Sequence, residues 1–403
     1  MKALLPETAA GSTGRKGNPV IIRFSPGLCI VVMCLFLVIC AASSPGEEGR
    51  STTIRTPLSN EAIAWLFNRM VIDYPNGDGF LGLKSNGTSF LLASETRIAC
   101  LDAAGALKWT IDFGDGEHNG MGAWTVSEDS CMLICSAKNV ELRCLSIADG
   151  STKWTLPLAE YIGAAIPVRG GSMLAIEDRK SWLVINTKGE RVYAAGACPV
   201  EGLLQASAGD LVFGTAMRAD PDTIYVPDSA WVSVSVGNLD GTGSRRLGHL
   251  SFGDPSKILG GTYGLGASEV FAAHSYGSAT LICAVSGARD QWTEEFVFSS
   301  AAILGSLLVC ADKSVRFYDC KSRKTVKEIT GAKECRVIEY DSERCVYIRQ
   351  GKAVGFVGPD YPGGIEIPET DVVFGATIAD DKLVYITDCA LVRAEMKKGK
   401  KKE

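Results

Sequence analysis

A hairpin that recurs along the chain constrains the fold more than any other feature of the sequence. Each copy has an apolar strand, a tight turn with a glycine, and a second strand with a tryptophan; the copies span 97–113, 140–158 and 279–296. The glycine precedes the tryptophan by four, four and five residues in the pairs Gly105–Trp109, Gly150–Trp154 and Gly287–Trp292. Such internal similarity indicates a repeat architecture.

Weaker copies of the hairpin, without the tryptophan, follow at 181–195, 231–252, 314–329 and 352–367. Each unit also has two strand-like segments upstream, which gives four strands per unit at a spacing of about 40–50 residues. One such sheet cannot bury its own faces, so stacking in a closed ring is expected. We predict an all-β fold, an eight-bladed β-propeller of four-stranded antiparallel blades, with seven blades as the alternative.

The domain boundaries follow from this repeat. The segment MVIDY at 70–74 precedes the first unit, and we expect it to supply the missing outermost strand of the last one. The expected organisation is a signal peptide or signal anchor, a linker, the propeller and a basic disordered tail, at 1–43, 44–61, 62–396 and 397–403.

The hairpin tryptophans are interpreted as blade-docking residues, because large aromatic side chains dominate local burial; they are Trp109, Trp154 and Trp292. The pattern Asp-x-x-Gly-x-x-x-Trp in the first copy, and Ala-Asp-Gly-Ser-Thr-Lys-Trp in the second, resembles the docking motif of the PQQ-like (quinoprotein-like) propeller superfamily. That superfamily includes pyrroloquinoline quinone (PQQ) dehydrogenases and non-enzymatic BamB-like lipoproteins of outer-membrane assembly. The resemblance covers most of residues 70–396.

The enzymatic members of that superfamily carry two adjacent cysteines and a calcium-binding acidic set. No two cysteines are adjacent here, and we expect no enzyme, no cofactor and no metal. The three histidines lie in different units without ligand spacing, at His118, His249 and His274. Two alternatives stay open: a quinoprotein-type or small-ligand-binding propeller with a site in the central channel, and an extracytoplasmic sensor domain.

The charge distribution argues against a nucleic-acid partner. The formal net charge is −5, of which residues 1–43 contribute +3 and residues 397–403 contribute +4, which leaves −12 between them. Nucleic-acid binding depends on neutralising phosphates with basic residues, and an acidic body lacks that footprint.

An apolar run of fifteen residues at 28–42 follows a net-positive segment. This length is short for a transmembrane helix and typical of a signal-peptide core. The run predicts an exported, membrane-associated protein on the periplasmic or extracytoplasmic side. Cleavage near Ala42, retention as an anchor and lipidation of Cys40 are the three expected fates; Ile39 departs from the small residue that a lipobox requires before its cysteine.

Eleven cysteines lie outside this leader, an odd number that leaves one unpaired in any monomer. Cys100, Cys144 and Cys283 occupy equivalent strands and are interpreted as small buried residues. One or two disulfides remain open.

Two longer connections suggest a binding surface. The segment 114–122 leads into Trp124, and the insertion 218–229 contains Tyr225. Exposed loops on a rigid scaffold often carry function. Trp124 and Tyr225 are therefore candidates for a partner-binding face, against the simpler reading of variable loops. We expect a monomeric propeller that binds envelope or membrane proteins as a non-enzymatic scaffold.

Overall fold

The computed structural model consists of antiparallel sheets preceded by one helix. The described residues are 53–395 apart from 74–81, 95, 114–120, 137–139, 159–161, 179–180, 196–198, 201–202, 209, 220–229, 253–257, 266–269, 277–278, 286–289, 295–299, 331–334, 341–343, 350–352, 359–360, 370 and 380–381. The described residues all belong to one compact unit, residues 51–403. No helix among them is both long and apolar enough to span a membrane.

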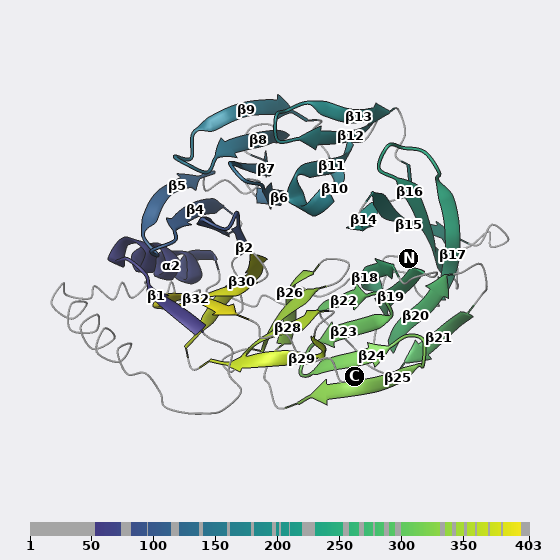
Figure 1. The fold of residues 1–403 in the computed structure, drawn as a ribbon. Helices are drawn as coiled ribbons and strands as arrows, with labels where there is room; N and C mark the ends of the chain where they lie inside the picture. Colours follow the sequence, from purple (N-terminus) through teal and green to yellow (C-terminus); the bar gives the residue numbers. More distant parts are fainter. Residues whose placement is uncertain are drawn as a thin grey trace, which may run out of the picture. The chain divides into compact units, whose positions relative to one another are not determined.

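The described strands form eight four-stranded sheets (Figure 1). Seven sheets are blades of four strands that are consecutive in the sequence. The first blade consists of β2 (Gly82–Ser85), β3 (Ser89–Ala93), β4 (Arg97–Asp102) and β5 (Leu107–Asp112), and the second of β6 (Met121–Val126), β7 (Ser130–Ser136), β8 (Val140–Ser146) and β9 (Thr152–Pro157). The third consists of β10 (Ile162–Val168), β11 (Met173–Asp178), β12 (Ser181–Asn186) and β13 (Arg191–Ala195). The fourth consists of β14 (Leu203–Ala208), β15 (Leu211–Ala219), β16 (Ala230–Asn238) and β17 (Arg245–Phe252).

The remaining blades follow in the same order. They are β18 (Ile258–Leu265), β19 (Val270–Tyr276), β20 (Ala279–Val285) and β21 (Asp290–Glu294); β22 (Ser300–Leu304), β23 (Leu307–Ala311), β24 (Val315–Asp319) and β25 (Lys324–Ile329); and β26 (Cys335–Tyr340), β27 (Cys345–Arg349), β28 (Ala353–Gly358) and β29 (Tyr361–Pro368). A short 3-10 helix, η1 (Arg169–Gly171), lies between β10 and β11.

The eighth sheet is composite and closes the ring. It has the order β1-β32-β31-β30, with β1 (Thr53–Pro57) from the beginning of the described chain and β30 (Val373–Ala379), β31 (Lys382–Thr387) and β32 (Ala390–Glu395) from its end. We call it the closing sheet. The innermost strand of each blade contacts the innermost strand of the next blade, from β2 and β6 through to β26. In the closing sheet the innermost strand is β30, which contacts both β26 and β2, so the sheets form a closed β-propeller. The sequence predicted eight blades, with seven as the alternative. Seven sheets are blades continuous in sequence, and the remaining four-stranded sheet is the composite closing sheet.

The closure differs from the expected one. Residues 70–73 are not strand but the end of helix α2 (Asn60–Asp73), so the predicted strand at 70–74 is wrong. The strand that closes the ring, β1, lies within the segment 44–61 that the sequence suggested as a linker. The propeller therefore begins upstream of residue 62.

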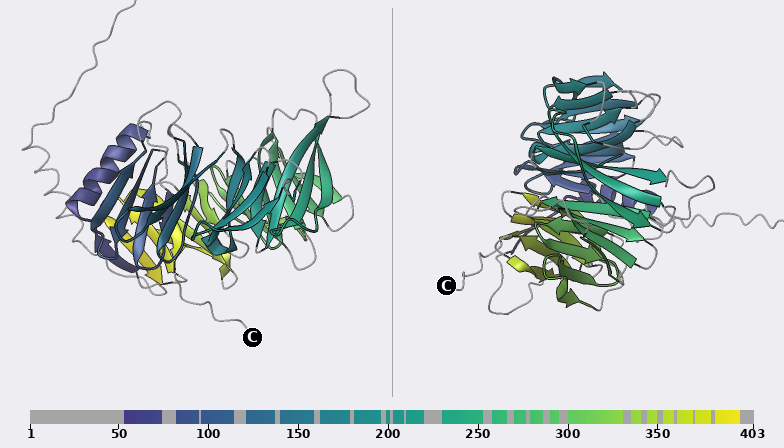
Figure 2. Two further views of the ribbon diagram at one scale, coloured as in Figure 1. Left: turned by 90° about the horizontal axis from the view of Figure 1, so that it is seen from above. Right: turned by 90° about the vertical axis from the view of Figure 1, so that its right-hand side faces the viewer.

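The helix begins where a side chain caps it. Ser59 Oγ accepts a hydrogen bond from the Ala62 backbone N–H at 3.3 Å, as an N-cap serine does. The buried residues Ala62, Trp65 and Leu66 recur at helical spacing. They join a core cluster with Phe90 of β3 and Leu391 of β32, which places α2 at the interface between the closing sheet and the sheet β2–β5 (Figures 1 and 2).

The hydrophobic core lies between the faces of neighbouring sheets. One cluster joins Leu91 and Ile98 of the sheet β2–β5 to Leu133 and Leu145 of the next sheet. Similar clusters join the sheet β10–β13 to both of its neighbours, and the sheet β26–β29 to the sheet β22–β25 and to the closing sheet. Another cluster joins the closing sheet to the sheet β2–β5. Burial between sheets, rather than within one, explains why a single unit cannot fold alone.

Candidate functional site

The hairpin tryptophans connect neighbouring sheets. Trp109 of β5 donates its indole N–H to the Ile147 carbonyl of the next sheet at 2.9 Å, and Trp154 of β9 donates to the Thr187 carbonyl at 3.0 Å. Both rings lie against a turn glycine of the neighbouring sheet: a Cβ at Gly150 would lie 2.8 Å from the Trp109 ring. Gly150 also has φ = 76°, so both the turn and the contact require glycine.

A cysteine accompanies each of these tryptophans. Cys100 pairs with Trp109 across β4 and β5, and its thiol lies 3.8 Å from the same Ile147 carbonyl. Cys144 pairs with Trp154 and lies 3.7 Å from the Thr187 carbonyl. Thiol and indole thus approach one carbonyl of the next sheet, a recurrence that sequence reasoning missed because it noted the cysteines only as buried.

A β-bulge defines the position of the docking residue. In β5 the bulge falls at Lys108, and the residue after it is Trp109. The same register puts Trp154 in β9, Tyr193 in β13, Gly248 in β17 and Lys327 in β25. We call this the docking position. Tyr193 lies against Gly241 of the following sheet, so a tyrosine takes the place of tryptophan there.

The third tryptophan is different. Trp292 lies in β21 and pairs with Ile282 without a bulge, so it is not at an equivalent register position. The sequence already showed the difference, since its spacing from the turn glycine is five residues rather than four. Its side chain lies outside the described part of the structure.

Of the candidate partner-binding residues, Trp124 lies in the innermost strand β6 and is half-buried. Its ring packs against Gly82 of β2, where a Cβ would be 2.8 Å away, and the Lys84 ammonium lies 5.4 Å from the ring centroid. Trp124 therefore contributes to the contact between the first two sheets. Tyr225 and Cys40 lie outside the described residues, as does His118.

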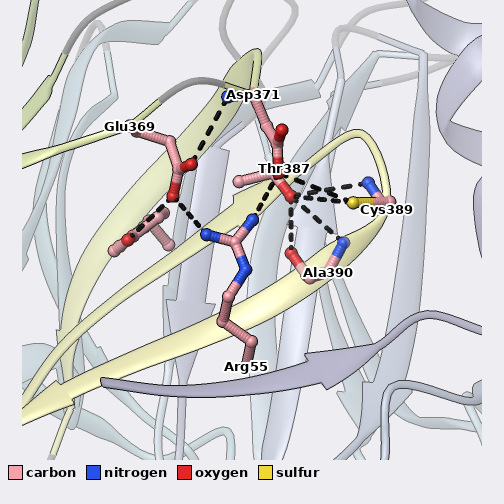
Figure 3. A network of polar contacts seen from close by, with 7 residues as sticks. Arg55, Glu369, Asp371, Thr387, Cys389 and Ala390 are labelled. Atoms are coloured by element: carbon pink, nitrogen blue, oxygen red, sulfur yellow. Dashed lines mark hydrogen bonds and ion pairs between the residues drawn. The ribbon is translucent and has the colours of Figure 1, made fainter. Parts of the chain in front are cut away.

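A polar cluster anchors β1 to the closing sheet (Figure 3). The Arg55 guanidinium bonds Glu369 Oε2 at 2.8 Å and also pairs with Asp371. The Glu369 side chain is only 3% exposed, and its Oε2 also accepts the Tyr385 hydroxyl at 3.1 Å. The charge-assisted bonds satisfy a carboxylate that would otherwise be costly to bury.

Within the same cluster, Asp371, Asp388 and Cys389 each place one possible ligand atom within 4.8 Å of the others. A cation there would compete with Arg55, whose guanidinium already pairs with Asp371. The Cys389 thiol also donates to Asp371 Oδ2 at 3.6 Å. These contacts are those of an anchor between strands, and the electrostatics beside Arg55 disfavour a metal.

The buried side chain of Asp388 lowers the stability of the folded protein. Its Oδ1 is buried without a hydrogen-bond partner among the described residues. Burial, and next the charge of Asp371, raise the pKa of the Asp388 carboxyl. A raised carboxyl pKa means that folding stability is lost as pH rises through the unfolded and then the folded pKa.

We therefore expect Asp388→Asn to raise the melting temperature at pH 7 by roughly 1–3 °C. Below about pH 4, where the wild-type carboxyl also carries a proton, the difference should disappear. Thermal unfolding of both proteins across pH 4–7 measures this difference in melting temperature. A variant whose advantage over wild type is smaller at pH 7 than at pH 4 contradicts the prediction.

The nine cysteines that the structure describes are thiols and form no disulfide; all but the half-buried Cys389 are buried. Cys100 and Cys144 are among the buried ones, as expected from the sequence. Burial raises the pKa of both Cys100 and Cys135 to about 11. The side chain of Cys283 is outside the described part.

Since the thiolate is the reactive form, these thiols should resist alkylation. Iodoacetamide at pH 7.5, followed by peptide mass analysis, should modify Cys389 ahead of the eight buried cysteines, and all nine only in denaturant. Rapid native labelling of Cys100 or Cys144 would show that the sheets do not pack as described.

No protein-family model matches the sequence, and no curated protein matches it. Solved structures give similarity at the level of the fold. BamB from Moraxella catarrhalis has 12% identity over 87% of this chain and 98% of its own, with a TM-score of 0.46. The C-terminal WD40 domain of Sif2 has 12% identity over 79% and 97%, with a TM-score of 0.48. Saccharomyces cerevisiae Sqt1 has 9% identity over 79% and 97%, with a TM-score of 0.49. The protein is a β-propeller, an assignment that rests on its strand pairing.

Proposed function

We propose that this protein is a non-enzymatic propeller that acts as a protein-interaction scaffold. The observation that carries the proposal is the use of its side-chain polar contacts. Trp109, Trp154 and Arg55 all bond across strands or sheets, and these contacts hold the ring together. A rigid ring with exposed turns and outer strands suits the presentation of binding surfaces.

The proposal has a finer form, which places the scaffold in the cell envelope as an exported, membrane-associated protein with a PQQ-like, BamB-like repeat. The apolar run at 28–42 supports export, and the recurring Gly-x-x-x-Trp hairpin supports the repeat type. Lipidation at Cys40, a cleaved leader and a retained anchor are its three versions.

Affinity capture of the full chain from detergent-solubilised membranes tests the scaffold, and intact-mass analysis of the mature protein tests the leader. The scaffold proposal requires a protein that co-purifies stoichiometrically with the folded chain and is absent when the captured chain has first been unfolded in urea. Capture of the propeller alone, across several detergents, would contradict it.

The quinoprotein alternative has a separate test. A ligand that binds only the folded state raises its stability by about 2.7 kcal/mol at a concentration of 100 Kd. Thermal unfolding with PQQ and calcium should leave the melting temperature unchanged if the protein is a scaffold. A saturable rise with PQQ would favour a cofactor site instead.

A further inference from the structure

The outermost strand β25 differs from the outermost strands β5 and β9 in its exposure. In β5 half-buried and exposed residues alternate, and β9 shows the same alternation after its first residue. In β25 five residues in succession are exposed, and only Ile329 is half-buried. The first five residues of β25 thus face solvent, and only Ile329 packs on the core between this sheet and the next.

The reason lies at the docking position. The β-bulge of β25 falls at Val326, and the residue after it is Lys327, where β5 and β9 have tryptophan. Lys327 is exposed, and its ammonium lies 5.5 Å from the ring centroid of Phe317 in its own sheet. The side chain at this position therefore does not fill the aromatic contact with the next sheet.

The exposed strand is also basic. The segment 321–328 contains one carboxylate, Glu328, and four basic residues, Lys321, Arg323, Lys324 and Lys327. The Glu328 carboxylate accepts bonds from Ser314 at 3.0 Å and Arg316 at 3.2 Å within the same sheet. The turn before β25 and the strand together thus carry a local excess of positive charge, whereas residues 44–396 as a whole sum to −12.

An apolar side chain lies at the centre of these charges. Val326 is 59% exposed, the highest fraction among the large apolar residues found exposed in the described part of the chain. β25 is the last strand of its sheet, so one edge of its backbone faces outward. An open strand edge with alternate side-chain contacts is how a sheet takes up an extended peptide.

We propose that the outer edge of β25 binds an extended acidic segment of a partner protein, which adds to the sheet as a fifth strand. Backbone hydrogen bonds supply affinity, Lys324 and Lys327 pair with carboxylates, and Val326 contacts an apolar residue between them. This inference rests on the proposed scaffold function and names the chemistry of its partner.

The test uses the full-length protein and a capped peptide of alternating glutamate and valine, seven residues long. Saturable binding is expected, and Lys324→Glu with Lys327→Glu should weaken it at least about tenfold, since like charges then face each other. The matched control, Lys188→Glu with Arg191→Glu, reverses two exposed basic residues on another sheet and should change affinity less than about twofold. Hydrogen exchange of Lys324–Ile329 amides should slow in the complex, and that of Leu107–Asp112 should not.

Lysines on an edge strand can also simply prevent edge-to-edge aggregation. Three results would overturn the proposal in favour of this protective role: equal peptide binding by the β25 variant and its matched control, no peptide binding by wild type, or unchanged amide hydrogen exchange in β25. If the glutamate variant does not fold, Lys324→Gln with Lys327→Gln replaces it. The capture from membranes separates the two proposals. If the β25 variant still captures the partner that wild type captures, the β25 site is refuted and the scaffold function stands. If wild type captures no partner, the scaffold function is refuted.

Discussion

Replacing Trp154 by alanine should destabilise the protein by about 2–4 kcal/mol, somewhat below the cost for a fully buried tryptophan because the ring is half-buried. The substitution removes the ring from its contact with Gly189 and the indole donor from the Thr187 carbonyl. Both losses fall between two sheets, so they weaken the ring and not only one sheet. Urea unfolding of the purified variant measures the change.

Trp154→Phe is the matched control, because it keeps an aromatic ring and removes only the indole N–H. We expect it to cost about 1 kcal/mol for the hydrogen bond, with a smaller packing loss. If Trp154→Ala is as stable as Trp154→Phe, the tryptophan does not fill the contact with the neighbouring sheet, and the docking position has no energetic meaning.

The second large effect concerns the beginning of the propeller. Removal of residues 1–58 should lower stability by on the order of 5 kcal/mol, a large share of what holds a protein together. The deletion takes away β1, its ladder with β32 and the buried Leu58. It also leaves the Glu369 carboxylate buried without Arg55, which alone costs several kcal/mol.

Removal of residues 1–50 is the control, because it keeps β1, Arg55 and Leu58. That protein should unfold at nearly the same temperature as the full chain. If the two deletion variants had the same melting temperature, whether high or low, the contribution of β1 to the closing sheet would be contradicted.

The blades were predictable because their strands alternate and their turns carry glycine. The two strands expected upstream of each hairpin are present, as β6 and β7 show before the hairpin of β8 and β9. The docking role of Trp109 and Trp154 was also visible, since their spacing from the turn glycine repeats.

Ring closure was not predictable in the same way. The sequence of β1, TIRTP, has no apolar alternation, and four of its five residues are exposed. Pairing with β32 makes it a strand, and nothing local indicates that partner. Residues 70–74 look more strand-like, but the Ser59 cap and the buried Ala62 and Leu66 favour a helix through residue 73.

The polar cluster was hidden for a related reason. Arg55 and Glu369 are 314 residues apart in the sequence, and neither belongs to a motif. The exposure of β25 depends on a bulge that shifts the register by one residue, so that Lys327 and not Val326 takes the docking position. Such a shift follows from strand pairing and leaves no signature in composition.

Closure of the ring by β1 is the central claim, and a designed disulfide tests it most directly. Ile54 and Arg393 are register partners across β1 and β32, which brings their backbones within the range that a disulfide can span. With both replaced by cysteine, we expect a disulfide between positions 54 and 393 under mild oxidation, and little disulfide with cysteines at 54 and 395. A bond that forms instead between cysteines at 70 and 393, with none from position 54, would contradict it.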